Sequence, residues 1–156
     1  MNSPISPAQF ELLLPLACEW AAEQEQHILA TGEVLSETQL HDARLVDVSR
    51  PERVRLLYVS EILPPAHPML RQAAEATHLI SPLTGGLTLR YGIFIRSDCR
   101  GNRPLIVHEL CHTLQYERMG GFEVFLRQYL SECLTIGYPE APMEQEVIER
   151  TARICA

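Results

Sequence analysis

The stretch that decides the fold lies at residues 104–121 and reads PLIVHELCHTLQYERMGG. Pro104 fits the first turn of a helix, where a missing N–H costs no hydrogen bond. The pair Gly120-Gly121 is typical of a helix end. The residues between them predict a buried helix because apolar side chains flank the polar ones, namely Leu105, Ile106, Val107, Leu110, Cys111 and Leu114.

Five residues of this predicted helix, His108-Glu109-Leu110-Cys111-His112, form an H-E-x-x-H string. His108 and His112 lie one turn apart on the same face, so both imidazoles can reach one ion. Glu109 projects beside them, where it can accept a proton from a metal-activated water. Two nitrogen ligands and an adjacent carboxylate are the core of a zinc hydrolase site. The string therefore predicts that His108 and His112 bind Zn²⁺ and that Glu109 is the general base.

Catalytic zinc usually has a third protein ligand. No histidine follows His112, so a third ligand from downstream must be a carboxylate. In the last predicted helix, Glu144 falls on the apolar face and Glu146 on the opposite face. A carboxylate on a buried face needs a partner, and a metal ion is one. Glu144 is thus the predicted ligand. Glu146 and Glu132, which lies at the edge of the apolar face of the preceding helix, remain alternatives.

The rest of the chain is predicted to combine amphipathic helices with short strands. The predicted helices begin at Ser6-Pro7 and at the capping-box sequence Ser36 to Gln39, and cover Met69–Thr77, Phe122–Leu134 and Pro142–Ile154. The first of them ends at Gly32, and Pro15 is a possible kink in it. The predicted strands are Leu45–Val48, Val54–Val59 and Leu87–Arg96, with a turn at Arg50-Pro51-Glu52 between the first two. The third strand alternates most cleanly and directly precedes the predicted metal-binding helix.

Composition bounds the class of protein. A length of 156 residues predicts one domain, 1–156, and the net charge of −7 argues against a nucleic-acid partner. No window of 18 apolar residues and no secretory signal pattern are found, so we expect no membrane segment. Five cysteines without a C-x-x-C pair fit reduced thiols better than a disulfide framework. These features predict a cytoplasmic protein.

Two segments of the chain resemble the H-E-x-x-H metallopeptidases of the gluzincin type, specifically small bacterial minimal zincin-like domains. The first runs from His108 to Arg118 and reads HELCHTLQYER, and the second runs from Pro142 to Val147 and reads PMEQEV. The resemblance covers about a quarter of the chain. It implies that the first Glu of the last element, Glu144, closes the metal site. In thermolysin-like enzymes the third ligand lies about where Glu132 stands, but their following Asp is replaced here by Ile136.

The resemblance also implies a fold and a substrate class. The expected fold is α+β and zincin-like, with a small, mostly antiparallel sheet packed on the active-site helix and on further helices. In such enzymes an extended peptide pairs with the strand at the edge of the cleft, which makes Tyr91 to Arg96 the candidate substrate shelf, although an ordinary sheet strand fits it equally well. The expected substrates are therefore peptides or proteins.

The sequence thus predicts a zinc-dependent metallopeptidase. Tyr116 and Tyr138 are candidate donors to the oxyanion, and the expected role of Gln115 is a hydrogen bond to a neighbouring element. The alternative is a non-catalytic regulatory or interaction module that uses the ion for stability, although such a site has no need of Glu109. A third hypothesis, a nucleophilic Cys111 or Cys99 acting with His78, has no support from spacing.

Overall fold

A computed structural model describes residues 5–156. These residues form an α+β fold with a four-stranded sheet. The helices are α1 (Pro7–Thr31), α2 (Glu37–Val46), α3 (Pro68–Thr77), α4 (Arg103–Met119), α5 (Phe122–Thr135) and α6 (Pro142–Ile154). The strands are β1 (Glu33–Val34), β2 (Arg55–Val59), β3 (Gly86–Leu89) and β4 (Gly92–Arg96), and two short 3₁₀ turns cover Pro51–Arg53 and Ser97–Cys99.

The sheet is mixed and has the strand order β1-β2-β4-β3. Both outer pairs, β1 with β2 and β3 with β4, are antiparallel, whereas the central pair of β2 and β4 is parallel. Two of the three strand pairs are thus antiparallel, as expected of a mostly antiparallel sheet, but the parallel central pair was not predicted. A parallel neighbour requires a crossover, and the chain from β2 through α3 provides it.

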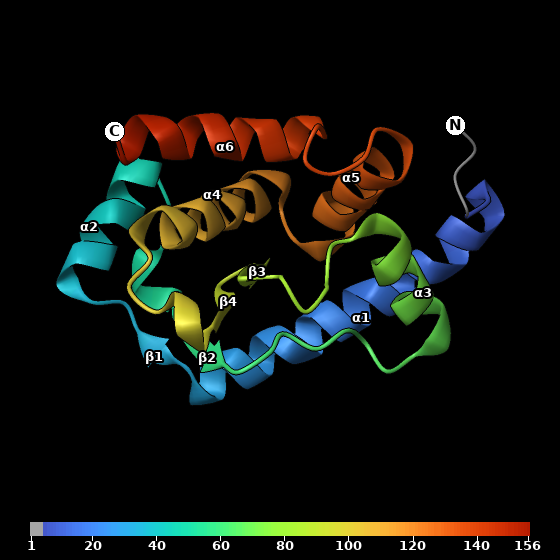
Figure 1. The fold of residues 1–156 in the computed structure, drawn as a ribbon, viewed down its shortest axis with the longest axis horizontal. Helices are drawn as coiled ribbons and strands as arrows, with labels where there is room; N and C mark the ends of the chain where they lie inside the picture. The colour runs from blue at the N-terminus through green and yellow to red at the C-terminus, as the bar shows by residue number, and fades with distance from the viewer. Residues whose placement is uncertain (1–4) are drawn as a thin grey trace.

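Helices cover both faces of the sheet. In Figure 1, α1 runs along the bottom of the molecule, α4 lies above the strands, and α6 lies alongside α4 on the outside. α2 closes one end, and α3 and α5 stand at the other. No helix among residues 5–156 is both long and apolar enough to cross a membrane.

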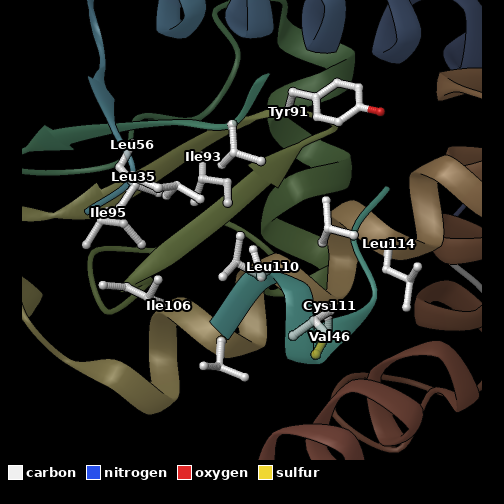
Figure 2. Close-up of a cluster of buried hydrophobic side chains, with 14 of the residues drawn as sticks. Leu35, Val46, Leu56, Tyr91, Ile93, Ile95, Ile106, Leu110, Cys111 and Leu114 are labelled. Atoms are coloured by element: carbon white, nitrogen blue, oxygen red, sulfur yellow. The ribbon is translucent and has the colours of Figure 1, made fainter. Parts of the chain in front are cut away.

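Successive side chains of β4 point to opposite faces of the sheet and pack in two different hydrophobic clusters. Ile93 and Ile95 are fully buried and face α4, where they pack with Leu56 and Leu110 (Figure 2). Phe94 faces the opposite way and packs in a cluster that also holds Ile28 of α1. β4 approaches α1 so closely that a Cβ on Gly92 would lie 3.0–3.2 Å from Ile28. The central strand is therefore buried on both faces, as a parallel strand normally is.

The segment predicted as one strand, Leu87–Arg96, is a hairpin. Leu89 pairs with Gly92, so Arg90 and Tyr91 form a two-residue turn, and Arg90 has a φ of 63°. A buried carboxylate holds the turn: Glu25 of α1 accepts two hydrogen bonds from the Arg90 guanidinium, at 2.9 and 2.7 Å, and one from the Tyr91 N–H at 3.0 Å. The prediction of a single strand was wrong because this long-range ion pair overrides the local alternation.

The hairpin also corrects the predicted substrate shelf. β4, which carries most of Tyr91 to Arg96, is hydrogen-bonded to β2 on one side and to β3 on the other. It therefore has no free edge, and Tyr91 itself lies in the turn. The edge strand on this side of the sheet is β3, Gly86–Leu89.

A second predicted strand, Leu45–Val48, was also wrong. Leu45 and Val46 continue α2, and Asp47 then ends the helix in the left-handed conformation, with a φ of 78°. The predicted capping box of this helix is confirmed, because Ser36 and Gln39 each accept a hydrogen bond from the other's backbone N–H. The two-residue strand β1 was not predicted at all.

The remaining helices and the strand β2 lie close to their predicted ranges. α1 passes through Pro15 and ends before Gly32 as expected. Asn102 precedes α4, and its side chain caps Leu105 N; Gly120 follows the helix in the left-handed conformation, with a φ of 85°. The boundaries predicted for the H-E-x-x-H helix are therefore confirmed.

Candidate metal centre

Three of the predicted site residues meet between α4 and α6. His108 Nε2 lies 2.6 Å from Glu144 Oε1, and His112 Nε2 lies 3.2 Å from Glu144 Oε2. One ligand atom of each residue lies within 4.8 Å of the others. In a tetrahedral zinc site the ligand atoms are separated by about 3.4 Å, since each lies about 2.0–2.2 Å from the ion. A small displacement of the carboxylate is thus enough for this group to hold a metal ion.

One oxygen of the Glu144 carboxylate, Oε1, lacks a well-aligned hydrogen-bond donor. The residue is only 1% exposed, yet Oε1 is buried without a partner that meets hydrogen-bond geometry. Burial raises the pKa of Glu144, but the contacts with His108 and His112 outweigh it and hold this pKa well below its ordinary value. Burial likewise lowers the pKa of His112, and Glu144 outweighs that effect and raises it to about 9. A buried, ionised carboxylate that lies between two imidazoles fits a metal ligand.

Gln115 fixes the tautomer of His112. Its Nε2 donates to Met143 O at 2.9 Å and to Glu146 Oε1 at 3.3 Å. The amide orientation leaves Oε1 as the atom that faces His112 Nδ1, at 2.9 Å. An amide oxygen only accepts, so Nδ1 carries a proton, and Nε2 is the nitrogen that faces Glu144 and would be available to a metal ion. The predicted hydrogen bond of Gln115 to a neighbouring element is confirmed, and it orients a candidate ligand as outer residues of metal sites do.

Tyr129 of α5 also contacts the centre. Its hydroxyl donates to Glu144 Oε2 at 2.9 Å, and its ring lies edge-on to His112 at 5.6 Å. Burial, and then the charge of Glu144, raise the pKa of Tyr129 well above its ordinary value, so the hydroxyl stays a donor. The sequence predicted Tyr129 only as part of the apolar face of α5. No local feature of the sequence indicates that this face of α5 packs against α6.

Glu109 lies beside the three residues but does not belong to the group. Thr88 of β3 donates its hydroxyl to Glu109 Oε1 at 2.8 Å and to Glu109 O at 3.0 Å. A Cβ on Gly86 would lie 2.9 Å from Glu109 Cγ and 3.1 Å from Oε2. The edge strand therefore positions this carboxylate, and only glycine at position 86 leaves it room. Neither Gly86 nor Thr88 was predicted as a site residue, because their contact with α4 is long-range and leaves no local signal in the sequence.

The two rival carboxylates are occupied elsewhere. Glu132 Oε1 accepts a hydrogen bond from Met143 N at 2.8 Å and thereby caps the start of α6. Glu146 is half exposed and lies 3.5 Å from Arg118. Neither belongs to the group of candidate ligands found among the described residues.

The other candidates occupy different places. Tyr116 lines the cleft, but it is buried, stacks on Phe125 at 3.6 Å and donates weakly to Thr88 O at 3.4 Å, so its main role is packing. Tyr138 lines the same cleft as the centre. Burial, and then the charges of Glu144 and Glu109, raise the pKa of Tyr138 to about 12. Its hydroxyl therefore stays protonated and can donate.

The cysteine hypothesis finds no support in the structure. Burial raises the pKa of the Cys111 thiol to about 11, and Thr151 Oγ1 lies 3.9 Å from its sulfur. Cys99 contacts Arg96 and Asp98. His78 is an exposed residue that ends α3.

The candidate centre opens into a cleft of about 750 Å³. Its walls include His108, Glu109, His112 and Glu144, together with the residues of β3. No family model matches the chain, and no curated protein or solved structure is detectably similar to it. Function is therefore inferred from the chemistry of the site.

Proposed function

We propose that this protein is a zinc-dependent hydrolase that cleaves peptide bonds. The observation that carries the proposal is the position of Glu109. This carboxylate is buried at the wall of the cleft, adjacent to His108 and His112, and its partner is Thr88 rather than a candidate metal ligand. A site that served only stability has no use for such a group.

The residues present fit the metal. Two imidazoles and one carboxylate are a common ligand set of catalytic zinc, and the set leaves one coordination position open. His108, His112 and Glu144 would hold the ion, while Gln115 and Tyr129 would orient two of them. When bound, the ion supplies a Lewis acid that activates a water and polarises a carbonyl.

Glu109 moves the proton in the proposed reaction. Water contributes its oxygen to the carbonyl carbon, the C–N bond breaks, and Glu109 accepts a proton from the water and delivers it to the leaving nitrogen. The hydroxyl of Tyr138 is our candidate donor to the oxyanion that forms. The expectation of a zincin-like arrangement rests on the same residues: an H-E-x-x-H helix lies behind an edge strand, and the third ligand comes from a later helix.

The edge strand β3 supplies a surface for the substrate backbone. Arg96 N donates to Gly85 O at 2.7 Å, and hydrogen-bonded pairs alternate along an antiparallel ladder. The backbone groups of Gly86 and Thr88 consequently point away from β4, and one of them, Thr88 O, accepts a long hydrogen bond from the Tyr116 hydroxyl at 3.4 Å. We infer that an extended peptide pairs with this edge, beside Glu109.

The test compares matched glutamine variants. Elemental mass analysis of the purified protein should find about one zinc per chain. Glu109→Gln should keep the metal and lose hydrolysis of an unfolded protein such as casein by about 10²–10⁴-fold. Glu144→Gln should lose the metal, whereas Glu132→Gln should keep it.

Other results would lead to different conclusions. Metal loss in Glu132→Gln and not in Glu144→Gln would reassign the third ligand. A stoichiometric ion with no hydrolysis would favour the alternative, a non-catalytic metal-binding module. If the unmodified protein binds no divalent metal, the proposal is wrong.

A further inference from the structure

The cleft has an unusual set of charged groups for one that would bind a peptide. None of the described residues that line the cleft is Arg, Lys or Asp. Two of them are glutamates, Glu109 and Glu144. Both carboxylates already have partners. Thr88 donates to Glu109, and Glu144 contacts two histidines and Tyr129.

The charged groups in the cleft limit which peptide bonds the site can select. An enzyme that removes residues from a chain end must bind the charged terminus: a carboxylate requires a cationic or multiple N–H partner, and an ammonium requires a carboxylate. Residues 5–156 place no guanidinium or ammonium in the wall of the cleft. Of its two carboxylates, Glu109 is the proposed base and Glu144 is the proposed metal ligand. Neither chain end therefore has a charged partner in it.

The wall beyond the metal centre is apolar. We define the apolar arm as the part of the cleft lined by Trp20, Leu70, Ala74, Ile80, Leu126 and Leu130, which come from α1, α3, the segment before β3, and α5. Trp20 also packs against the clusters that hold Leu89 and Ile80, which connects the arm to the edge strand. Together with the site, the arm forms a space of about 750 Å³, enough for more than one large side chain.

We propose that the substrates are extended polypeptide segments with large apolar side chains, and that the bond cut lies inside the chain rather than at an end. This inference rests on the proposed hydrolase function. The β3 edge binds the backbone of any sequence, whereas the apolar arm selects side chains by the burial of apolar surface. Folded proteins bury such segments, so unfolded chains are the natural source.

A binding experiment tests the inference without turnover. Trp20 is the single tryptophan of the chain and lines the apolar arm, so its emission reports occupancy. Zinc-loaded Glu109→Gln protein is titrated with ten-residue peptides whose ends are acetylated and amidated. The central pair is Leu-Phe, Ser-Ser or Asp-Asp. We expect the Leu-Phe peptide to bind at least about tenfold more tightly than the other two.

A matched pair of leucine variants locates the binding. Leu130 lines the arm and is only partly buried, whereas Leu12 on α1 is 67% exposed and lies outside the cleft. Leu130→Glu should weaken binding of the Leu-Phe peptide by about tenfold, because an ionised group would enter an apolar wall. Leu12→Glu should leave it within about twofold. Zinc content should be the same in both variants.

The position of the cut bond is tested with the unmodified, zinc-loaded protein. Cleavage of the capped Leu-Phe peptide at an internal bond supports the proposal. Cleavage that needs a free amino or carboxyl end overturns it and leaves the hydrolase function standing. Equal affinity for all three peptides, or no change in Trp20 emission with any of them, also overturns it. Selective binding without hydrolysis by a zinc-loaded protein would refute the proposed function but keep the apolar recognition.

Discussion

Helix α4 has two buried faces that differ in what they pack against. One face is apolar, and its residues, Ile106, Val107, Leu110, Cys111 and Leu114, form the main core with the sheet. The other face is polar. Its Glu109, His112 and Gln115 are each less than 10% exposed and are held by partners on β3 and α6.

The difference shows that one face of the helix contributes mainly to folding stability and the other to the candidate site. The apolar face gains free energy from any close-packed neighbour, so its composition is enough to bury it. The polar face costs free energy on burial unless each group finds a particular partner. We therefore expect substitutions on the first face to change folding stability, and those on the second to change the site.

The largest expected effect is on the apolar face. Leu110 is fully buried between the helix and β4, and Leu110→Ala should lower the free energy of unfolding by about 2–5 kcal/mol because it leaves a cavity. Urea unfolding of the metal-free protein measures it. Zinc stoichiometry at low temperature should not change. A loss of zinc from a still-folded variant would show that the two faces are not separable.

The next effect sharpens the role of the polar face. Gly86→Ala should push Glu109 out of position, since the added methyl group would lie 2.9 Å from its Cγ. We expect hydrolysis to fall by about 100-fold while zinc affinity stays within about threefold. Gly101→Ala serves as a control for stability alone, because nothing lies within 4 Å of an added Cβ there and its φ of 80° strains only the local backbone. Equal activity of Gly86→Ala and the unmodified protein would contradict the proposed base.

Gln115 provides an intermediate effect. Gln115→Met keeps the shape of the side chain but removes the acceptor for His112 Nδ1 and the donor to Met143 O. Zinc affinity, measured by competition with a chromogenic chelator, should fall by about 10–100-fold. The control is Gln26→Met at an exposed position of α1. An unchanged affinity would show that the tautomer of His112 is set by another group.

A smaller effect is expected for Tyr129→Phe. This change removes one hydrogen bond to Glu144 Oε2 and preserves the ring packing. The same competition assay should show zinc affinity reduced by about 3–10-fold. A tighter zinc complex would instead mean that the tyrosine competes with the ion for the carboxylate.

The smallest expected effect concerns two buried thiols, Cys111 on the apolar face of α4 and Cys133 on α5. Burial raises the pKa of Cys111 to about 11 and that of Cys133 to about 12. The thiolate fraction of Cys111 at pH 8 is thus about one in a thousand, and it increases as the pH rises. Brief treatment with iodoacetamide, followed by mass spectrometry, should leave both thiols of the native protein unmodified. Unfolding in urea should expose them, and rapid labelling of the native protein would mean that water reaches the labelled thiol.

The sequence determined what depends on neighbours along the chain. It predicted the boundaries of α4, the capping box at Ser36, and the burial of Glu144 from its place on the apolar face of α6. These follow from the helical period and from the bonding needs of helix ends. The H-E-x-x-H spacing also determined that His108 and His112 lie on one face.

Tertiary structure decided what depends on partners far away. Glu25 of α1 turned a predicted single strand into a hairpin, and so made β3 rather than β4 the edge beside the centre. The contacts of Thr88 and Tyr129 with the site span 21 and 15 residues and have no local signal. A periodic pattern states which face of a helix is buried, but only the packed fold selects the groups that meet that face.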